Sequence, residues 1–182
     1  MQPNKARTDL WMDLALVAFL IALDVVARLL PHAPGFLPVA ASGLFAARVL
    51  RIPALAIVVP VLAMILSDVA LPGEDWRIQA VGFAAIAIPA VAGIATRRWG
   101  GFLPTTATVV VSSILFFLLS NFAVWAFSGM YPLNLSGLTQ CYIAALPFLE
   151  KTMLGDLFWT GVLFGGAWLV MRTPALARVR AR

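Results

Sequence analysis

Long apolar stretches separated by short polar or proline-containing breaks dominate this chain. The apolar stretches cover about residues 10–30, 36–50, 54–71, 78–96, 105–127 and 152–171. A helix of about 20 apolar residues is long enough to cross the hydrocarbon core of a bilayer. The pattern therefore predicts an all-α, polytopic integral membrane protein, a six-helix bundle in one membrane domain over residues 1–182.

Two parts of the pattern depart from simple crossings. The stretch 36–50 is short for a straight span, so we expect its neighbours to bury it or the helix to enter at an angle. The connection 128–151 is too polar to span, but it holds an amphipathic stretch at 137–149. We expect an amphipathic outer segment there, between the fifth and sixth helices, lying at the membrane surface or covering the bundle mouth as a lid.

Composition supports the same class of protein. Hydrophobic residues make up 62% of the chain and charged residues 12%, against about 45–50% and 25% in soluble domains. The mean hydropathy is +0.96. Most soluble enzyme classes are thereby excluded. We interpret the net charge of +5 as a signal of membrane topology and not of nucleic-acid binding.

The basic residues predict the orientation of the bundle. Cytoplasmic loops of membrane proteins are enriched in Lys and Arg. With six crossings, only Arg28, Arg77 and Lys151 fall on the outer side, and a re-entrant second segment with five crossings would spoil this agreement. We therefore expect a bacterial inner membrane protein with both termini cytoplasmic. The basic residues on the terminal side are Lys5, Arg7, Arg48, Arg51, Arg97, Arg98, Arg172, Arg178, Arg180 and Arg182.

Polar residues in four different spans fall at a similar depth on the outer side. Ionisable groups at the centre of a span cost about 2.5–3.5 kcal/mol each on insertion scales, so they usually mark function. The pattern predicts a solute pocket open to the outside. The alternative is a purely structural role, in which Asp24 pairs with Arg28 one turn later on the same helix and Asn121 bridges two helices. The four residues are Asp24, Asp68, Asn121 and Asp156.

Further candidates for substrate binding crowd the segment after the fifth span. Aromatic residues at this level also form ordinary interfacial belts, so both interpretations remain open. The only cysteine excludes an internal disulfide, and His32 is either a loop residue or a ligand. The additional substrate-binding candidates are Trp125, Met130, Tyr131, Cys141 and Tyr142.

No nucleotide-binding or metalloprotease motif is present in the sequence. We therefore expect a binding or transport protein without an intrinsic cofactor, and no hydrolysis of ATP by this chain. An intramembrane enzyme that uses Asp68 and Asp156 as a carboxylate pair, or a structural or assembly subunit, is the alternative.

A set of short motifs resembles a family of small uncharacterised bacterial membrane proteins. The resemblance covers about residues 28–166 and implies no assigned activity. The motifs are Leu30-Pro31-His32, Pro34-Gly35-Phe36, Pro38, Ser42-Gly43, Phe45-Ala46, Ile65-Leu66-Ser67-Asp68, Asn121-Phe122-Ala123-Val124-Trp125, Cys141-Tyr142, Leu146-Pro147-Phe148 and Gly155-Asp156.

The six-span layout, the short second segment and Ser67-Asp68 also resemble substrate-binding S-components of energy-coupling-factor transporters, especially the solitary BtuM-type proteins of vitamin B12 uptake. This resemblance implies uptake of a vitamin-like solute such as cobalamin or another corrinoid, with Cys141 or His32 as the cobalt ligand. Ala18 and Ala22 are similar to the motif by which S-components dock on an ATP-driven transmembrane coupling subunit. The expected partners are the lipid bilayer, the solute and that subunit.

Overall fold

The computed structural model describes residues 3–71, 73 and 75–172 of the chain. The regular structure of these residues is entirely helical, as predicted. The helices are α1 (Pro3–Leu29), α2 (Val39–Val49), α3 (Leu55–Asp68), α4 (Trp76–Ile86), α5 (Ile88–Ala95), α6 (Phe102–Phe127) and α7 (Leu135–Arg172).

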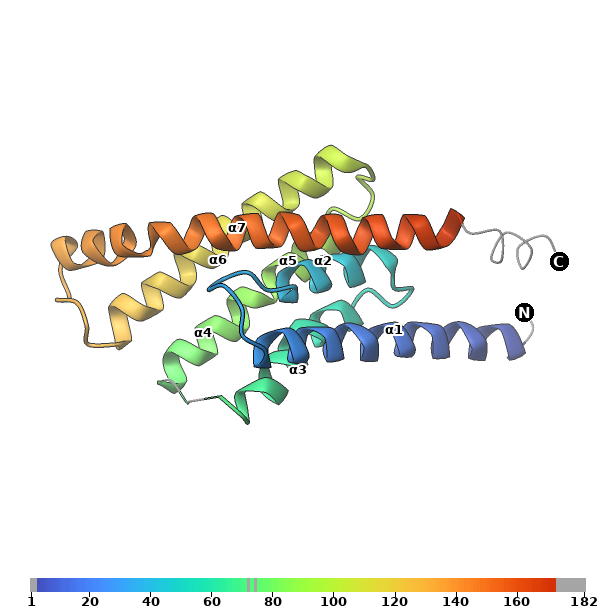
Figure 1. Ribbon diagram of the computed structural model, residues 1–182, viewed down its shortest axis with the longest axis horizontal. Helices are drawn as coiled ribbons and strands as arrows, with labels where there is room; N and C mark the ends of the chain where they lie inside the picture. The colour runs from blue at the N-terminus through green and yellow to red at the C-terminus, as the bar shows by residue number, and fades with distance from the viewer. Residues whose placement is uncertain (1–2, 72, 74, 173–182) are drawn as a thin grey trace.

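The helices run up and down along the long axis of the molecule (Figure 1). The loops α1–α2, α3–α4 and α6–α7 lie toward one end, and the loops α2–α3 and α5–α6 lie toward the other, near the start of α1 and the end of α7. Because α4 and α5 follow one another as a single pass, the described chain makes the six passes that the hydrophobic pattern predicts.

Helix α4 ends and α5 begins at Ala87, a break that the hydrophobic pattern does not predict. Pro89 lies in the first turn of α5. Proline has no N–H to donate to the carbonyl of Ala85, four residues earlier, and its ring crowds that carbonyl. The pass is therefore kinked, although Trp76–Ala95 as a whole is long and apolar enough to cross a membrane.

Helix α2 is short because it is the buried centre of the bundle. Eight of its 11 residues are buried, and it contacts α1, α3, α5 and α7. Gly93 of α5 sits so near this helix that a Cβ atom would lie 2.8 Å from Ala47 Cβ and from Leu44 Cδ1. The expectation that neighbouring helices bury the second apolar segment is confirmed.

The main hydrophobic core lies toward the end with the chain termini. It joins α1, α2, α3 and α5. Ala46, Ala47 and Ala90 let the helix backbones approach closely there. The rest of the core consists of Val17, Leu20, Phe45, Leu50, Ala56 and Val59. The helices are thus tightly joined at this end, and the polar residues discussed below lie toward the other.

Helix α7 is one continuous helix of 38 residues. The prediction of a separate amphipathic segment between the last two spans is therefore wrong. Pro147 lies inside the helix without ending it. Contacts with α6 hold the first part of α7 in line: the Phe117 and Tyr142 rings lie 5.6 Å apart, and Tyr142 Oη donates to the Leu118 carbonyl at 2.7 Å.

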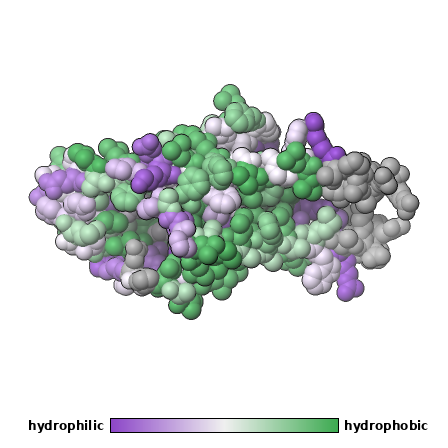
Figure 2. All heavy atoms as spheres, in the orientation of Figure 1, coloured by the Kyte–Doolittle hydropathy of each residue, from purple (hydrophilic) through white to green (hydrophobic). Residues whose placement is uncertain are grey.

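Large apolar side chains cover much of the outside of the bundle. They include Phe19 at 59% exposure and Val111 at 54%. Figure 2 shows hydrophobic residues over most of the middle of one face, and hydrophilic residues mainly toward the two ends. Four segments, Asp9–Leu29, Trp76–Ala95, Phe102–Phe127 and Leu135–Arg172, are long and apolar enough to cross a membrane, while α2 and α3 are shorter apolar helices.

The charged residues are held differently at the two ends. At the end with the chain termini, Arg51 pairs with Asp9, and Arg97 Nη2 donates to the Leu50 carbonyl at 2.7 Å. At the other end Arg77 donates to Asp75, and this hydrogen bond lowers the pKa of Asp75 to about 2. The Lys5 side chain and Arg178, Arg180 and Arg182, which also support the predicted orientation, lie outside the described residues.

Candidate functional site

A cavity of about 680 Å³ lies within the bundle, toward the end with the α1–α2 and α3–α4 loops. Every pass of the chain contributes to its wall. Cavities of about 300–1,000 Å³ are typical of small-molecule sites. The lining residues are Arg28, Gly35, Leu37, Val39, Ala40, Met64, Asp68, Leu71, Gly73, Ile78, Gln79, Gly82, Ile86, Pro89, Ser112, Phe116, Ser120, Val124, Thr152 and Asp156.

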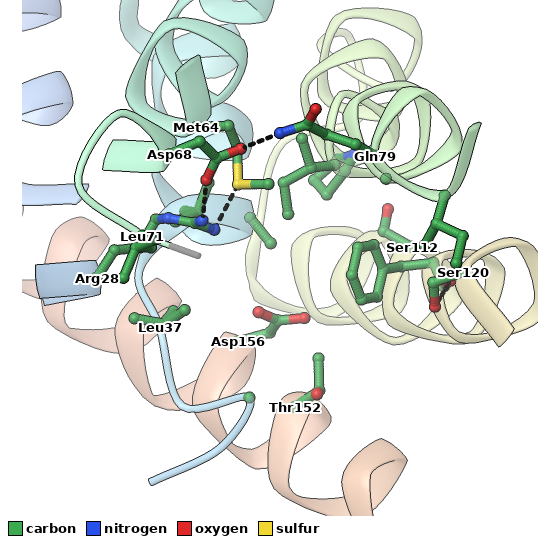
Figure 3. A pocket seen from close by; sticks show the side chains of 18 of the residues that line it. Arg28, Leu37, Met64, Asp68, Leu71, Gln79, Ser112, Ser120, Thr152 and Asp156 are labelled. Carbon is green, nitrogen blue, oxygen red and sulfur yellow. Dashed lines mark hydrogen bonds and ion pairs between the residues drawn. The ribbon is translucent and has the colours of Figure 1, made fainter. Parts of the chain in front are cut away.

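One side of the cavity carries an ion pair between α1 and α3. Arg28 Nη2 donates to Asp68 Oδ1 at 2.6 Å, and Arg28 Nε donates to Ser67 Oγ at 2.6 Å. Gln79 Nε2 of α4 donates to Asp68 Oδ2 at 2.9 Å. Figure 3 shows Arg28, Asp68, Gln79 and Met64 together on this side. Both carboxylate oxygens of Asp68 therefore have donors from other helices.

The opposite side carries a second carboxyl group with a different environment. Asp156 of α7 is 5% exposed, and its Oδ2 accepts a hydrogen bond of 2.6 Å from Ser113 Oγ of α6. Within the described residues its Oδ1 accepts no hydrogen bond and it forms no ion pair. Figure 3 shows the Asp156 carboxyl group pointing into the cavity, with Thr152 one turn away on α7.

The remaining wall is largely apolar. Leu37, Met64, Ile86 and Phe116 are among its residues, with Ser112 and Ser120 of α6 as isolated hydroxyl groups. Hydrophobic walls with a few well-placed polar groups are typical of sites for small organic ligands. The arrangement can enclose an apolar body and offer it a guanidinium–carboxylate pair on one side and a carboxyl group on the other.

Two of the four predicted polar residues in the spans, Asp68 and Asp156, line this cavity. Asp24 does not. It is fully buried between α1 and α2, where Ser42 Oγ donates to its Oδ1 at 2.8 Å. Arg28, the expected partner of Asp24, pairs with Asp68 of α3 instead. Asp68 and Asp156 are thus brought to one cavity, whereas Asp24 joins α1 to α2. A role of either acid in substrate binding stays a prediction.

The candidates in the α6–α7 hairpin bond groups within the hairpin and are absent from the cavity lining. Asn121 Nδ2 donates to the Phe117 carbonyl at 2.8 Å. Cys141, which is buried, contacts the Asn121 carbonyl at 3.5 Å. Trp125 Nε1 donates to the Pro132 carbonyl at 3.1 Å. Since no residue of 128–149 lines the cavity, the predicted lid over it is also wrong.

Met130, Tyr131 and His32 also lie away from the cavity lining. Met130 is 68% exposed, and His32 is an exposed loop residue whose Nδ1 lies 2.7 Å from the Leu30 carbonyl oxygen. Among the described residues, no group of three or more His, Cys, Asp and Glu side chains is placed to hold a metal ion. A role for Cys141 or His32 as a cobalt ligand stays a prediction.

Several residues that line the cavity carry no sequence signal that marks them as site residues. Gln79 is the second residue of the apolar stretch 78–96, so the hydropathy pattern places it at the start of a span and does not mark it as a site residue. Ser112 lies within the apolar stretch 105–127, and Thr152 begins the stretch 152–171. Small hydroxyl residues are ordinary in membrane helices and often bond a carbonyl of their own helix, as Ser120 does. Only tertiary structure can therefore tell which of them line a cavity.

Fold and cavity together define this chain as an all-helical protein with several helices able to cross a membrane and an internal site of small-molecule size. Residues 8–177 match the model of a Family of unknown function (DUF6580), and the chain belongs to that family. No curated protein and no solved structure matches the chain significantly.

Proposed function

We propose that this chain is a multi-pass protein of the bacterial inner membrane that captures a small vitamin-like solute in its cavity and helps to move it inward. The cavity of about 680 Å³, reached by all passes of the chain and carrying polar groups on two opposite sides, is the observation on which the proposal rests. The apolar outer surface supports a location within a bilayer.

The polar groups indicate the kind of solute. Arg28 and Asp68 together contribute no net charge, and Asp156 adds a carboxyl group across the cavity. A solute with an apolar or aromatic body and hydrogen-bond donors at its ends matches this distribution. A complete corrinoid is larger than the drug-sized ligands that cavities of about 300–1,000 Å³ enclose. We therefore favour a smaller vitamin-like solute over cobalamin for this cavity.

Movement of the solute across the bilayer requires an energy source. The sequence has no nucleotide-binding motif, so we propose that another protein supplies the energy. Ala18 and Ala22 lie on the exposed side of α1. Small residues there leave space for the close approach of a helix from another protein. We propose that an ATP-driven transmembrane subunit docks on this side of α1, as the resemblance to S-components implies.

The cavity itself provides the sharpest test. Gly82 of α4 lines it, and a Cβ atom at that position would meet nothing within 4 Å. The change Gly82→Leu should therefore fill part of the cavity without disturbing its walls. Gly161 of α7 is also open but lies outside the lining, so Gly161→Leu is the matched control.

The measurement is the Tm of the purified protein against a panel of vitamins that includes thiamine, riboflavin, biotin and cobalamin. At least one compound should raise the Tm of the wild-type protein and of Gly161→Leu, because ligands that bind only the folded state stabilise it. Gly82→Leu should lose this shift. An unchanged Tm across the panel, or an equal shift in Gly82→Leu, would refute solute binding in this cavity. A visible absorption spectrum characteristic of a corrinoid, and distinct from that of riboflavin, would instead indicate a bound corrinoid in the purified protein.

A further inference from the structure

The charged side chains around the cavity of about 680 Å³ do not balance. Among the described residues that line it, those with ionisable side chains are Arg28, Asp68 and Asp156. The Arg28 guanidinium group donates to Asp68 Oδ1 and to Ser67 Oγ, each at 2.6 Å. It therefore compensates the Asp68 carboxylate and is not free to reach across the cavity. The Asp156 carboxyl group is left without a positive partner.

No cationic side chain in the described part of the chain compensates Asp156. This residue is 5% exposed, and it takes part in no ion pair there. Arg77 pairs with Asp75, and Lys151 is exposed. A carboxylate that is shielded from water is costly unless a positive charge accompanies it. An occupant of the cavity can supply that charge.

The hydrogen bonds of Asp156 leave one of its oxygens available to such an occupant. Ser113 Oγ donates to Oδ2 at 2.6 Å, and Oδ1 accepts no hydrogen bond from the described residues. Figure 3 shows the carboxyl group pointing into the cavity. Thr152, one turn earlier on α7, also lines the cavity, and its Oγ1 makes no hydrogen bond with the described residues. Both oxygens can accept N–H groups of a cation.

We propose that the solute is an organic cation whose charged end binds to the Asp156 carboxylate. Where that end is a protonated amine, Thr152 Oγ1 accepts a second N–H group. The largely apolar wall encloses the rest of the solute. Phe116, one turn after Ser113 on α6, is part of this wall, and an aromatic ring attracts a cation placed over its face. This inference rests on the proposed function and adds the charge of the solute to it.

The same charges disfavour an anionic solute. A carboxylate on the solute would share the cavity with Asp156, and it would find the Arg28 guanidinium group already engaged by Asp68. Like charges repel strongly in a site that is shielded from water. Biotin, which is an anion near neutral pH, should therefore not raise the Tm of the protein.

The test uses pairs of compounds that differ in one group, an ammonium in the first and a hydroxyl in the second. Pyridoxamine is compared with pyridoxine, and tryptamine with tryptophol, near neutral pH. Thiamine is included as a further cation. The Tm of the purified full-length protein at increasing concentrations gives the Kd of each compound. At least one cation should bind, and an ammonium compound that binds should do so about tenfold or more tightly than its hydroxyl partner, because a charge-assisted hydrogen bond is stronger than a neutral one.

Asp156→Asn removes the charge but keeps the size of the side chain and an oxygen that accepts from Ser113. It should weaken the binding of the cation about tenfold or more and leave that of the hydroxyl partner unchanged. Without solute it should keep the wild-type Tm or exceed it, because an uncompensated buried charge is removed. Asp24→Asn is the matched control. It changes a carboxyl group that is also buried but lies outside the lining, so the preference for the cation should remain.

Four results would overturn the inference. They are equal Kd values for both members of a pair, a preference for the cation that survives in Asp156→Asn, a cation shift that survives in Gly82→Leu, and binding of neutral or anionic compounds alone. If neutral or anionic compounds alone raise the Tm and Gly82→Leu abolishes their shift, the proposed function stands and only the charge of the solute is wrong. If no compound raises the Tm, the proposed function and this inference both fail. The comparison of pairs on the wild-type protein remains decisive even where Asp156→Asn does not fold.

Discussion

Arg28 joins more of the candidate site than any other single residue. Its guanidinium group bonds Ser67 and Asp68 of α3, and Gln79 of α4 completes the hydrogen bonds of Asp68. The Arg28 and Asp68 side chains are 15% and 20% exposed, so the pair is largely shielded from water. A partly buried pair with several donors is more costly to break at one partner than to replace as a whole.

Arg28→Met should therefore lower the free energy of unfolding by about 3 kcal/mol, because it leaves the Asp68 carboxylate buried and uncompensated. Combining Arg28→Met with Asp68→Asn should recover at least about 1 kcal/mol of this loss. Thermal unfolding of the four members of the cycle measures the coupling. Arg77→Ala, at an exposed ion pair with Asp75, should leave the Tm nearly unchanged. Additive single and double variants would contradict the coupling.

Asp68 and Asp156 could be predicted as site residues from the sequence, because an ionisable residue within an apolar stretch is visible without any knowledge of the fold. It did not allow their partners to be assigned. Arg28 lies one turn from Asp24 on the same helix, and this proximity favoured a local pair. The structure pairs Arg28 with α3, because α1 packs on α3 and both Arg28 and Asp68 lie at the C-terminal ends of these helices. Such a choice depends on helix rotation, which hydropathy does not encode.

At the scale of elements, the α1–α2 loop is held against α7 by a backbone contact. A Cβ atom at Gly155 would lie 2.9 Å from Phe36 Cα and 3.1 Å from the Gly35 carbonyl oxygen. The Phe36 and Phe158 rings lie 5.3 Å apart beside this contact. Gly35, with a φ of +78°, turns the loop at this point. Asp156 follows Gly155 directly, so this contact helps to position the Asp156 carboxyl group.

Gly155→Ala should push the loop away from α7 and lower the stability by about 1–3 kcal/mol, because backbone atoms cannot yield as a flexible side chain can. The control is Gly166→Ala on the same helix, where a Cβ atom meets nothing within 4 Å. This change should keep or raise the Tm, since alanine favours a helix by up to about 1 kcal/mol over glycine. Equal Tm values for the two variants would exclude a structural role for the Gly155 contact.

The helix boundaries show where hydropathy is a sufficient guide and where it is not. Each predicted apolar stretch forms helix over most of its length, because a long apolar run has few other ways to satisfy its backbone. The first part of α7 is different. Its amphipathic composition is equally consistent with a surface helix. In the structure it continues into the last pass and packs on α6, where Tyr142 and Cys141 contact backbone carbonyls of that helix.

At the scale of the whole molecule, the tightly packed core and the cavity lie toward opposite ends of the long axis. The alanine-rich core joins α1, α2, α3 and α5 toward the end with the chain termini. The cavity lies toward the opposite end, beside the α1–α2 and α3–α4 loops. Helix α7, about 57 Å long at 1.5 Å per residue, exceeds a hydrocarbon core of about 30 Å. Figure 1 shows the additional length at the α6–α7 hairpin, which extends beyond the rest of the bundle.

The orientation predicted from the basic residues can be tested directly, because the chain has a single cysteine. In a Cys141→Ala background, His32→Cys introduces a thiol in the exposed α1–α2 loop, and Gly100→Cys introduces one in the exposed α5–α6 loop. A membrane-impermeant maleimide applied to spheroplasts, which lack the outer membrane, should label only the cysteine at position 32. The cysteine at position 100 should react only after the membrane is opened.

This pattern would place the cavity toward the outer side of the inner membrane, where a solute taken up from outside first arrives. The reverse pattern would place the cavity toward the cytoplasm, where it would suit export or intracellular sensing and not capture. Labelling of both positions in sealed spheroplasts would contradict the alternation of loops between the two sides, on which the proposal of uptake depends.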